Sequence, residues 1–419
     1  MTAPATTSPR PPATVAGPAT VGGYARDYLS RIRGGDMGAL PAVLGLLALC
    51  TLFSLLHPAF LTVGNFANLF IQGASVTLIA MGLVFVLLVG EIDLSAGFAS
   101  GLCAAVLASL LTWQGWPWYL AVLAALATGA VIGLVLGVLV ARVGIPSFVV
   151  TLAGFLAFQG VMLIIIRGGT IIPVRDEVIV AIINRNLPPA LGWLLAAAGV
   201  AGFAAVQLRE QRRRAGRGLV AAPVQVVLIR IATLALIAGL AVYVLNLERS
   251  RTVTVSLKGV PIVVPVIVVL LVIGTFVLHR TRFGRHLYAV GGNREAARRA
   301  GIEVTRVRIA AFMICSTMAA VGGIVAASRS NSVDATTGGS DVLLLAVGAA
   351  VIGGTSLFGG KGRLVNGVIG GAVVAVIDNG MALMGYSAGV KFAVTGLVLL
   401  LAAGVDAVSR SRAFATGTR

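Results

Sequence analysis

The chain has 419 residues, of which 58% are hydrophobic and only 11% are charged, whereas about a quarter of the residues of a soluble domain are charged. Water is therefore excluded as the main solvent, and apolar runs of roughly 20 residues, the length that crosses a bilayer as a helix, recur along the chain. The formal net charge of +18 lies between these runs, which excludes a nucleic-acid-binding surface and favours an all-α, polytopic membrane protein.

The N-terminal segment is polar and rich in Pro, Ala, Thr and Gly, so residues 1–37 are predicted to form a disordered cytoplasmic tail and not a signal peptide. Apolar runs bounded by charges, Gly and Pro then predict about twelve membrane-spanning helices, with residues 409–419 as a cytoplasmic C-terminal tail. The predicted spans lie near residues 39–56, 72–89, 94–112, 118–141, 148–166, 190–207, 225–247, 260–279, 307–327, 341–357, 364–384 and 390–408.

The distribution of basic residues predicts the orientation of these spans. With both termini in the cytoplasm, most of the 32 Lys and Arg residues fall in cytoplasmic segments, as the positive-inside rule requires. The aromatic residues Trp113, Trp116, Trp118 and Tyr119 then lie in an outer turn, at the depth that amphipathic rings prefer. A basic run at 209–217 faces the cytoplasm, where it either contacts a partner or anionic lipid or acts as a topology determinant.

The chain has 53 glycines, and many of them lie inside the predicted spans. Gly129, Gly133 and Gly137 repeat every four residues along one helix, and Gly367 and Gly371 do the same, which lets helix backbones approach closely in lipid. We interpret them as packing residues, although a channel-lining role is open. The three cysteines lie in apolar runs without metal-ligand spacing and are also interpreted as packing residues.

Catalytic signatures are missing. The segment GTSLFGGKG at 354–362 resembles a P-loop, but Thr355 stands where that pattern requires Gly, and Gly362 stands where it requires Ser or Thr. The histidines have no HExxH or other ligand spacing, so no metal or other cofactor is expected. The chain is therefore not expected to be an enzyme, and any ATP hydrolysis that drives transport is expected on another chain.

Ionisable residues at membrane depth cost about 2.5–3.5 kcal/mol each on insertion, so each of them needs a reason. Glu91 and Asp93, in GEIDLSAG, precede a helix that Ser95 can cap, so they either cap its N-terminus or act in gating. Asp378 and Asn379 either line a polar solute route or bond to a neighbouring helix.

The polar segment 281–306 is too hydrophilic to span the membrane. Asn293 can cap a short helix, with Glu295 in its first turn, Arg298 and Arg299 near its end, and Gly301 in the left-handed closing position. These residues predict a helix of about two turns on the cytoplasmic face of the membrane. Such a helix either docks in a groove of a partner or is a capped connector without one.

Five blocks of sequence resemble the permease subunits of ABC importers for monosaccharides, the ribose, galactose and xylose group. The pair of spans around the basic loop QLREQRRRAGR is most similar to xylose-type members, because ribose-type members lack much of residues 167–258. The blocks are GEIDLSAG at 90–97, IPSFVVTLAGFLAFQGVM at 145–162, TRFGRHLYAVGGNREAARRAGI at 281–302, VIGGTSLFGGKG at 351–362 and AVIDNGMALMG at 375–385.

The resemblance implies a permease domain over residues 38–408, with a cytoplasmic coupling loop at 280–308. It implies a homodimer in the bacterial inner membrane, bound to two ABC ATPase subunits and served by a periplasmic or lipid-anchored sugar-binding protein, with D-xylose as the expected substrate. Two positions depart from the family pattern: Ala96 stands where Val is usual, and Gln159 stands where xylose-type relatives are expected to have Arg.

The site residues fall into two sets. The residues implied to couple the permease to the ATPase are Arg282, Gly284, Arg285, Gly291, Asn293, Glu295, Ala296, Ala297 and Gly301. The candidates for translocation or gating are Glu91, Asp93, Gln159, Asp378 and Asn379.

Three other classes of protein fit the sequence less well than a permease does. An ion-driven secondary transporter of a small polar solute needs a relay of buried carboxylates, and the predicted spans hold few acids. A lipid-modifying enzyme needs a nucleophile and a base, of which the sequence offers no constellation. A purely structural membrane protein is disfavoured only weakly.

Overall fold

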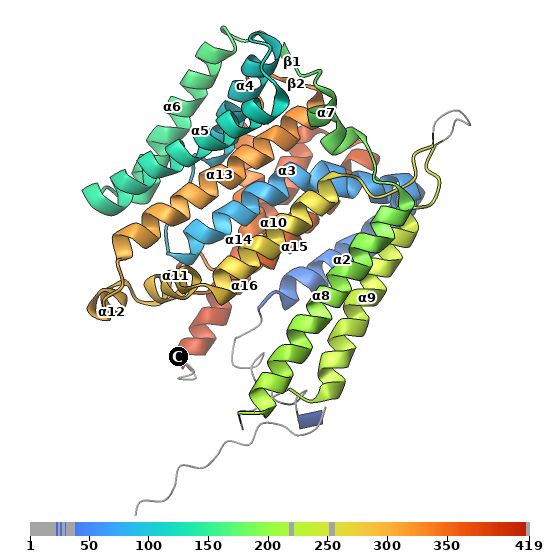
Figure 1. The fold of residues 1–419 in the computed structure, drawn as a ribbon, viewed down its shortest axis with the longest axis vertical. Coiled ribbons are helices and arrows are strands. Elements are labelled where there is room, and N and C mark those ends of the chain that lie inside the picture. Colours follow the sequence, from blue (N-terminus) through green and yellow to red (C-terminus); the bar gives the residue numbers. More distant parts are fainter. Residues whose placement is uncertain are drawn as a thin grey trace, which may run out of the picture.

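The computed structural model describes residues 38–217, 222–250 and 256–415, with a few isolated positions between 22 and 30 and with side chains up to residue 404 apart from 402 and 403. The predicted tail at 1–37 lies almost wholly outside the described residues. Most of the described chain is helical, which confirms the all-α fold class (Figure 1).

Eight of the described helices are long and apolar enough to cross a membrane. They are α3 (Val63–Leu88), α5 (Trp118–Val138) with its π-helical continuation η2 (Leu139–Val143), α6 (Ser147–Ile165), α8 (Pro189–Ala215), α9 (Val224–Leu245), α10 (Val263–Arg280), α13 (Val304–Ser330) and α15 (Leu364–Leu383). Four further apolar helices are α2 (Leu40–Leu56), α4 (Ala96–Thr112), α14 (Ser340–Ile352) and α16 (Ala388–Ala415). Each predicted span therefore coincides with one helix.

The ends of four spans were predicted wrongly, and one of them is α8, which ends at Ala215 instead of 207. α3 begins at Val63, nine residues before the predicted start at 72, because the Thr62 side chain accepts a bond from the Asn65 amide and opens the helix among polar residues. α14 ends at Ile352 instead of 357, since Gly353 and the left-handed Gly354 follow it. Its 13 residues rise only about 20 Å, less than the hydrocarbon thickness. α16 runs past the predicted end at 408 to Ala415, into the predicted tail.

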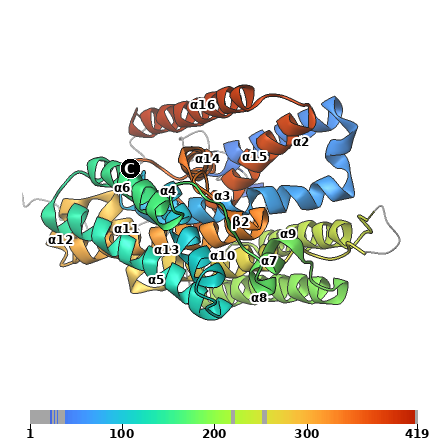
Figure 2. The same cartoon turned by 90° about the horizontal axis from the view of Figure 1, so that it is seen from above.

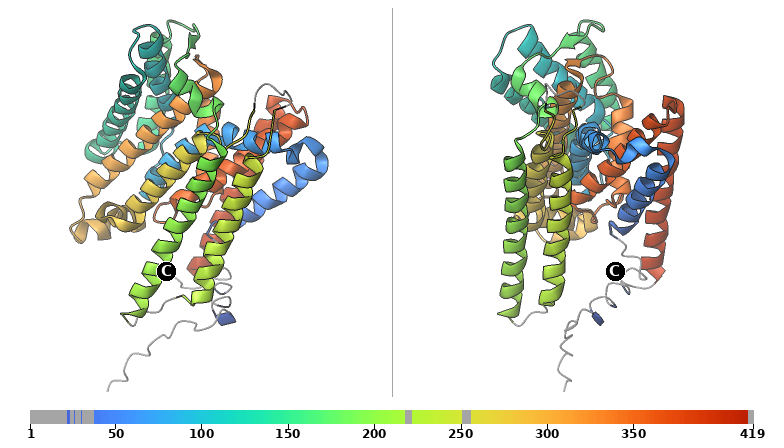
Figure 3. Two further views of the ribbon diagram at one scale, coloured as in Figure 1. Left: turned by 45° about the vertical axis from the view of Figure 1, so that its right-hand side comes forward. Right: turned by 90° about the vertical axis from the view of Figure 1, so that its right-hand side faces the viewer.

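The core of the molecule surrounds α3, in which nearly every residue from 74 to 89 is buried. α13 and α15 pack along α3, and α4 and α5 pack against α13 (Figure 1). Figure 2 shows α16 on one flank of this core and α8 on the opposite flank. α8 and α9 stand side by side as a pair (Figure 3) and expose most of their apolar side chains, as a lipid-facing hairpin does.

The predicted glycine stripes are confirmed as packing surfaces. A Cβ on Gly129, Gly133 or Gly137 of α5 would collide with backbone atoms of α13, from the Ser316 carbonyl to the Ile309 Cα. Gly367 and Gly371 of α15 lie equally close to α3. Because lipid offers no hydrophobic drive for helix association, this close backbone contact is the source of van der Waals stabilisation.

The loops gather at two opposite ends of the helices. At one end, called here the β end, β1 (Ile172–Pro173) pairs antiparallel with β2 (Ser332–Val333), and α7 (Glu177–Asn184) packs beside them. The predicted outer aromatic residues lie there too, since Arg167 stacks over Trp113 and Thr112 donates a hydrogen bond to the Pro173 carbonyl. The opposite end holds α11 (Arg282–Gly292), α12 (Arg294–Arg299), the α3–α4 junction and the loop 353–363, and is called the α12 end (Figure 1).

Candidate functional site

The polar segment after α10 folds into two short helices, of which the sequence predicted only the second. The Thr281 hydroxyl accepts a hydrogen bond from the Gly284 amide at 3.2 Å and starts α11. Leu287 and Val290 form a buried face on this helix, so Thr281 and the spacing of these apolar residues were the signal for it. The other side of α11 is polar, which made the segment resemble a loop.

The predicted cap of α12 is confirmed. The Asn293 side chain accepts from the Ala296 amide at 2.9 Å, and Gly301 adopts the left-handed conformation with φ of +79° after the helix. The helix has six residues and is therefore shorter than the predicted two turns. Glu295 lies in its first turn and pairs with Arg299 at 3.4 Å on the exposed face.

The nine residues predicted for coupling separate into an exposed face and a packed face. Most of them are exposed at the α12 end, where a partner has access to them: Arg282, Arg285, Asn293, Glu295, Ala296 and Gly301. Gly284, Gly291 and Ala297 pack inward instead. The structure therefore brings the predicted set together on one small element and gives its members two different tasks.

α11 is packed backbone to backbone against the end of α3. A Cβ on Gly291 would collide with the Leu88 carbonyl and would come within 2.6 Å of the Gly360 nitrogen. The Gly360 amide itself donates to the Leu88 carbonyl at 2.9 Å. The segment that resembled a P-loop thus serves as a spacer between α3 and α11.

Tyr288 adds a side-chain bond to this contact. Its hydroxyl donates to the Gly362 carbonyl at 2.8 Å. Burial raises the pKa of the Tyr288 phenol above its ordinary value, against a smaller opposing effect of Arg363. The phenol therefore stays protonated and remains a donor at neutral pH.

The acidic pair of the GEIDLSAG block divides between two roles. Asp93 is fully buried, and its Oδ1 accepts bonds from the Ser95 amide at 2.8 Å and the Ser95 hydroxyl at 2.6 Å, directly before α4. These local bonds favour the interpretation of Asp93 as a structural residue at the N-terminus of α4. Ser95, in contrast, makes no side-chain cap bond, so its predicted role as the cap is wrong.

The capping role is wrong for Glu91. Its Oε1 accepts from Arg294, the first residue of α12, at 2.5 Å and lies 2.6 Å from Nη2 of Arg308 in the second turn of α13. The Glu91 side chain is 7% exposed and that of Arg308 is 12% exposed, so these two charges are shielded from water, while Arg294 is 43% exposed. Neither arginine was among the predicted site residues, because more than 200 residues separate each of them from Glu91.

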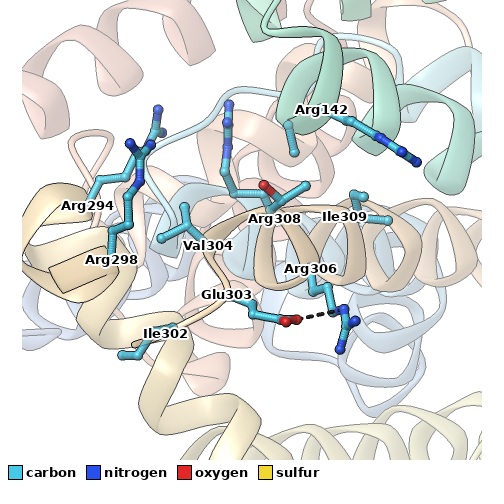
Figure 4. A pocket seen from close by; sticks show the side chains of 11 residues that line it. Arg142, Arg294, Arg298, Ile302, Glu303, Val304, Arg306, Arg308 and Ile309 are labelled. Atoms are coloured by element: carbon cyan, nitrogen blue, oxygen red, sulfur yellow. Dashed lines mark ion pairs between the residues drawn. The ribbon is translucent and has the colours of Figure 1, made fainter. Parts of the chain in front are cut away.

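An open pocket of about 640 Å³ lies beside this ion pair. α12 and the start of α13 form one side of it and η2 forms the other (Figure 4). Arg142 enters it from η2, while Arg294 and Arg298 enter from α12. Glu303, which also lines the pocket, is paired with Arg306 at 2.6 Å.

The remaining translocation candidates lie away from the α12 end. Gln159 is on α6, about 18 Å along the helix from its start at Ser147. Asn379, on α15, forms two side-chain hydrogen bonds of 2.8 Å with Asn65 of α3, one in each direction. It also donates a hydrogen bond to Gln72 at 3.0 Å. Asp378 is half exposed and pairs with Lys391 at 3.4 Å. The contacts of Asn379 favour the interpretation as a bond to a neighbouring helix.

The two adjacent residues on α15 are expected to respond differently to substitution. Asn379→Ala leaves the buried amide of Asn65 without its partner, so we expect a loss of about 1–3 kcal/mol in the free energy of unfolding. Asp378→Asn breaks only a partly exposed ion pair and is expected to have little effect. Thermal unfolding in detergent measures both variants. Equal melting temperatures would show that the amide cluster does not stabilise the bundle.

One further motif match needs its structural context. The sequence GYSAG at 385–389 fits the GxSxG pattern of serine hydrolases, so the prediction that no Ser lies in this pattern is wrong. It connects α15 to α16, whereas the hydrolase nucleophile lies between a strand and a helix. Within the described residues, no group of three or more His, Cys, Asp or Glu side chains could hold a metal ion.

The family described as "branched-chain amino acid transport system / permease component" matches residues 65–403, from the first turn of α3 into α16. The chain belongs to this family of permeases. No solved structure matches it.

Several curated relatives of this permease are sugar permeases. It is 38% identical to the xylose transport system permease protein XylH of Escherichia coli strain K12 over 354 residues, which are 84% of this chain and 87% of the relative. It is 33% identical to XylH of Haemophilus influenzae over 84% of this chain and 92% of the relative. It is 31% identical to the ribose import permease protein RbsC of E. coli K12 over 87% of this chain and 92% of that protein.

The predicted resemblance is therefore confirmed. The chain is a multi-pass inner-membrane permease component of a transport system, and it is not itself an enzyme. The ATPase and the sugar-binding protein of such a system are separate partners.

Proposed function

We propose that this chain is the membrane-spanning subunit of an ATP-driven ABC importer that carries D-xylose across the bacterial inner membrane. The observation that carries the proposal is the 38% identity to the XylH permease over 84% of the chain. The exposed, capped helix α12 also supports the proposal. A short polar helix that lies beyond the ends of long membrane spans can dock in a groove of a partner.

The active assembly is proposed to be a homodimer with two ATPase subunits at the α12 end, which faces the cytoplasm. Closure of the ATPase pair pulls the two α12 helices together and rocks the attached spans, so that a central route opens first outward and then inward. Residues 38–408 form the permease domain and 280–308 the coupling loop, with 1–37 and 409–419 as cytoplasmic tails. The complex is expected to have two copies of each subunit by mass measurement in detergent.

Reconstitution tests the function directly. The permease, its ATPase and the sugar-binding protein in liposomes are expected to take up labelled xylose only when ATP is present. An ionophore that collapses the proton gradient is expected to leave this uptake unchanged. Uptake that needs the ion gradient and not ATP would instead identify an ion-coupled secondary transporter.

The contacts of the acidic residues disfavour that second candidate. An ion-driven transporter needs carboxylates that are free to exchange protons or sodium along the route. Glu91 is held by two arginines, Asp93 by Ser95, and Asp378 by Lys391.

A double substitution tests the coupling role of α12. Glu295→Ala with Gly301→Ala is expected to abolish uptake and ATPase binding while expression is retained. A Cβ on Gly301 meets no described atom within 4 Å, but at φ of +79° it costs about 1–2 kcal/mol in backbone strain, so the end of α12 shifts without a clash. Gly301→Asn is the control, because Asn tolerates the left-handed conformation. Normal uptake by the double variant would refute the role.

A further inference from the structure

The α3–α4 junction is bound on two sides by the segment that carries the proposed coupling helix. On one side, α11 packs through Gly291 against the Leu88 carbonyl, directly before the junction. On the other side, the Glu91 carboxylate holds Arg294 of α12 and Arg308 of α13. Gly90, with φ of +75°, breaks the helix between these contacts.

The Glu91–Arg308 pair is shielded from water, whereas the Arg294 side chain that joins it from α12 is 43% exposed. A buried carboxylate is tolerated only when its charge is compensated, and Arg308 still compensates Glu91 when Arg294 is removed. Arg294 belongs to α12 and Arg308 to α13, and both bind the same Oε1 atom of Glu91. A displacement of α12 must therefore pull Glu91 with it or break the pair.

At its other end, the junction is bonded to the core, so a displacement of Glu91 is transmitted to the core helices. Asp93 is fully buried and binds the Ser95 amide and hydroxyl where α4 begins. α4 is itself buried over most of its length, and α3 is the central helix of the bundle. The segment from Val89 to Ser95 therefore joins the coupling element to two core helices.

The open pocket gives α12 room to move. Close-packed helices resist displacement, whereas the space of about 640 Å³ separates α12 from η2 (Figure 4). α12 is thus held on the Glu91 side and unrestrained on the pocket side.

We infer that Glu91, through Arg294 and Arg308, is the positioning residue that transmits a displacement of α12 to the α3–α4 junction. This inference rests on the proposed function and names the internal contact through which coupling travels. Glu91 does not contact the ATPase in this scheme; it acts between the docking helix and the core.

Arg294→Gln is the most informative variant, because it removes only the ion pair between α12 and Glu91 and leaves Glu91 paired with Arg308. In the reconstituted importer, the variant is expected to retain the ATPase subunit and to hydrolyse ATP in response to the loaded sugar-binding protein. Xylose uptake per ATP hydrolysed is expected to fall at least about tenfold. A residue with a merely structural role would lower both activities together.

Three comparisons complete the test. Glu91→Gln is expected to uncouple in the same way, and Glu91→Asp, which keeps the carboxylate, is expected to recover part of the uptake per ATP. Glu303→Gln removes a nearby acid that is paired with Arg306 and does not touch the junction, so it is expected to behave as wild type. Melting temperatures of the purified complexes identify any variant that is misfolded.

Two results would overturn the inference. One is a wild-type ratio of uptake to hydrolysis in Arg294→Gln; the other is an equal loss of coupling in Glu303→Gln. Failure of the proposed function is distinguishable from both, since the wild-type assembly would then show no ATP-dependent xylose uptake at all.

Discussion

Gly291→Ala is expected to abolish ATP-driven uptake, whereas Gly292→Ala at the next position is expected to leave it near the wild-type level. Both glycines are in the last turn of α11, so they share helix propensity and backbone conformation. A Cβ at Gly291 would collide with the Leu88 carbonyl and the Gly360 nitrogen, which belong to backbone that cannot turn aside. A Cβ at Gly292 meets no described atom within 4 Å.

The expected cause of the loss is displacement of α11 from α3. Overpacking in a close-packed site costs about 1–3 kcal/mol, and more where both sides are backbone. The 2.9 Å bond from the Gly360 amide to the Leu88 carbonyl and the bond from Tyr288 to Gly362 are expected to break with it. α12 would then be presented to the ATPase in a different orientation.

Uptake into liposomes and copurification of the ATPase subunit measure both variants. Gly291→Ala is expected to lose both activities, which distinguishes it from the uncoupled Arg294→Gln. If Gly291→Ala transports as well as Gly292→Ala, the contact between α11 and α3 is not required for coupling.

Gly133→Val is expected to separate α5 from α13 and to give the largest loss of stability in the bundle. A Cβ at this position already lies 2.5 Å from the Met313 Cα and collides with the Phe312 carbonyl. The added methyl groups enlarge the collision, and we expect several kcal/mol of destabilisation because neither helix backbone can yield locally.

Ala127→Val is the matched control, because Ala127 lies on the exposed face of the same helix. The yield of folded protein and the melting temperature in detergent measure both variants. Gly133→Val is expected to lower the yield and the melting temperature, whereas Ala127→Val is expected to change neither of them. A stable Gly133→Val protein would mean that α5 can move away from α13 without loss, contrary to the packing that the glycine stripe indicates.

Much of the fold could be predicted from the sequence because its signals are local. Apolar runs of membrane length identify the helices, and the positions of Asn293 and Gly301 identify both ends of α12. The element boundaries were less predictable where polar residues continue a helix, as at Asn65 in α3. α11 was missed because its buried face consists of few apolar residues among arginines.

The central contact of the site could not be predicted for a different reason. Glu91 meets Arg294 and Arg308 only after the bundle has formed, and one sequence gives no indication of which distant charges will pair. The short range of the Asp93 bond to Ser95 made that contact predictable, whereas the neighbouring acid had no local partner to indicate its role. Local chemistry therefore predicted the helices, but it did not predict the ion pairs of Glu91 that connect them.

The peripheral position of the α8–α9 pair has a consequence for the architecture of such permeases. Near the β end, Val242 and Leu245 form a small apolar cluster with Ala67 that is separate from the main core. At the other end, Glu210 of α8 pairs with Arg280 of α10 on the surface. A hairpin attached in this way can be gained or lost as one cassette during gene evolution, since its excision leaves the contacts among α3, α13 and α15 untouched.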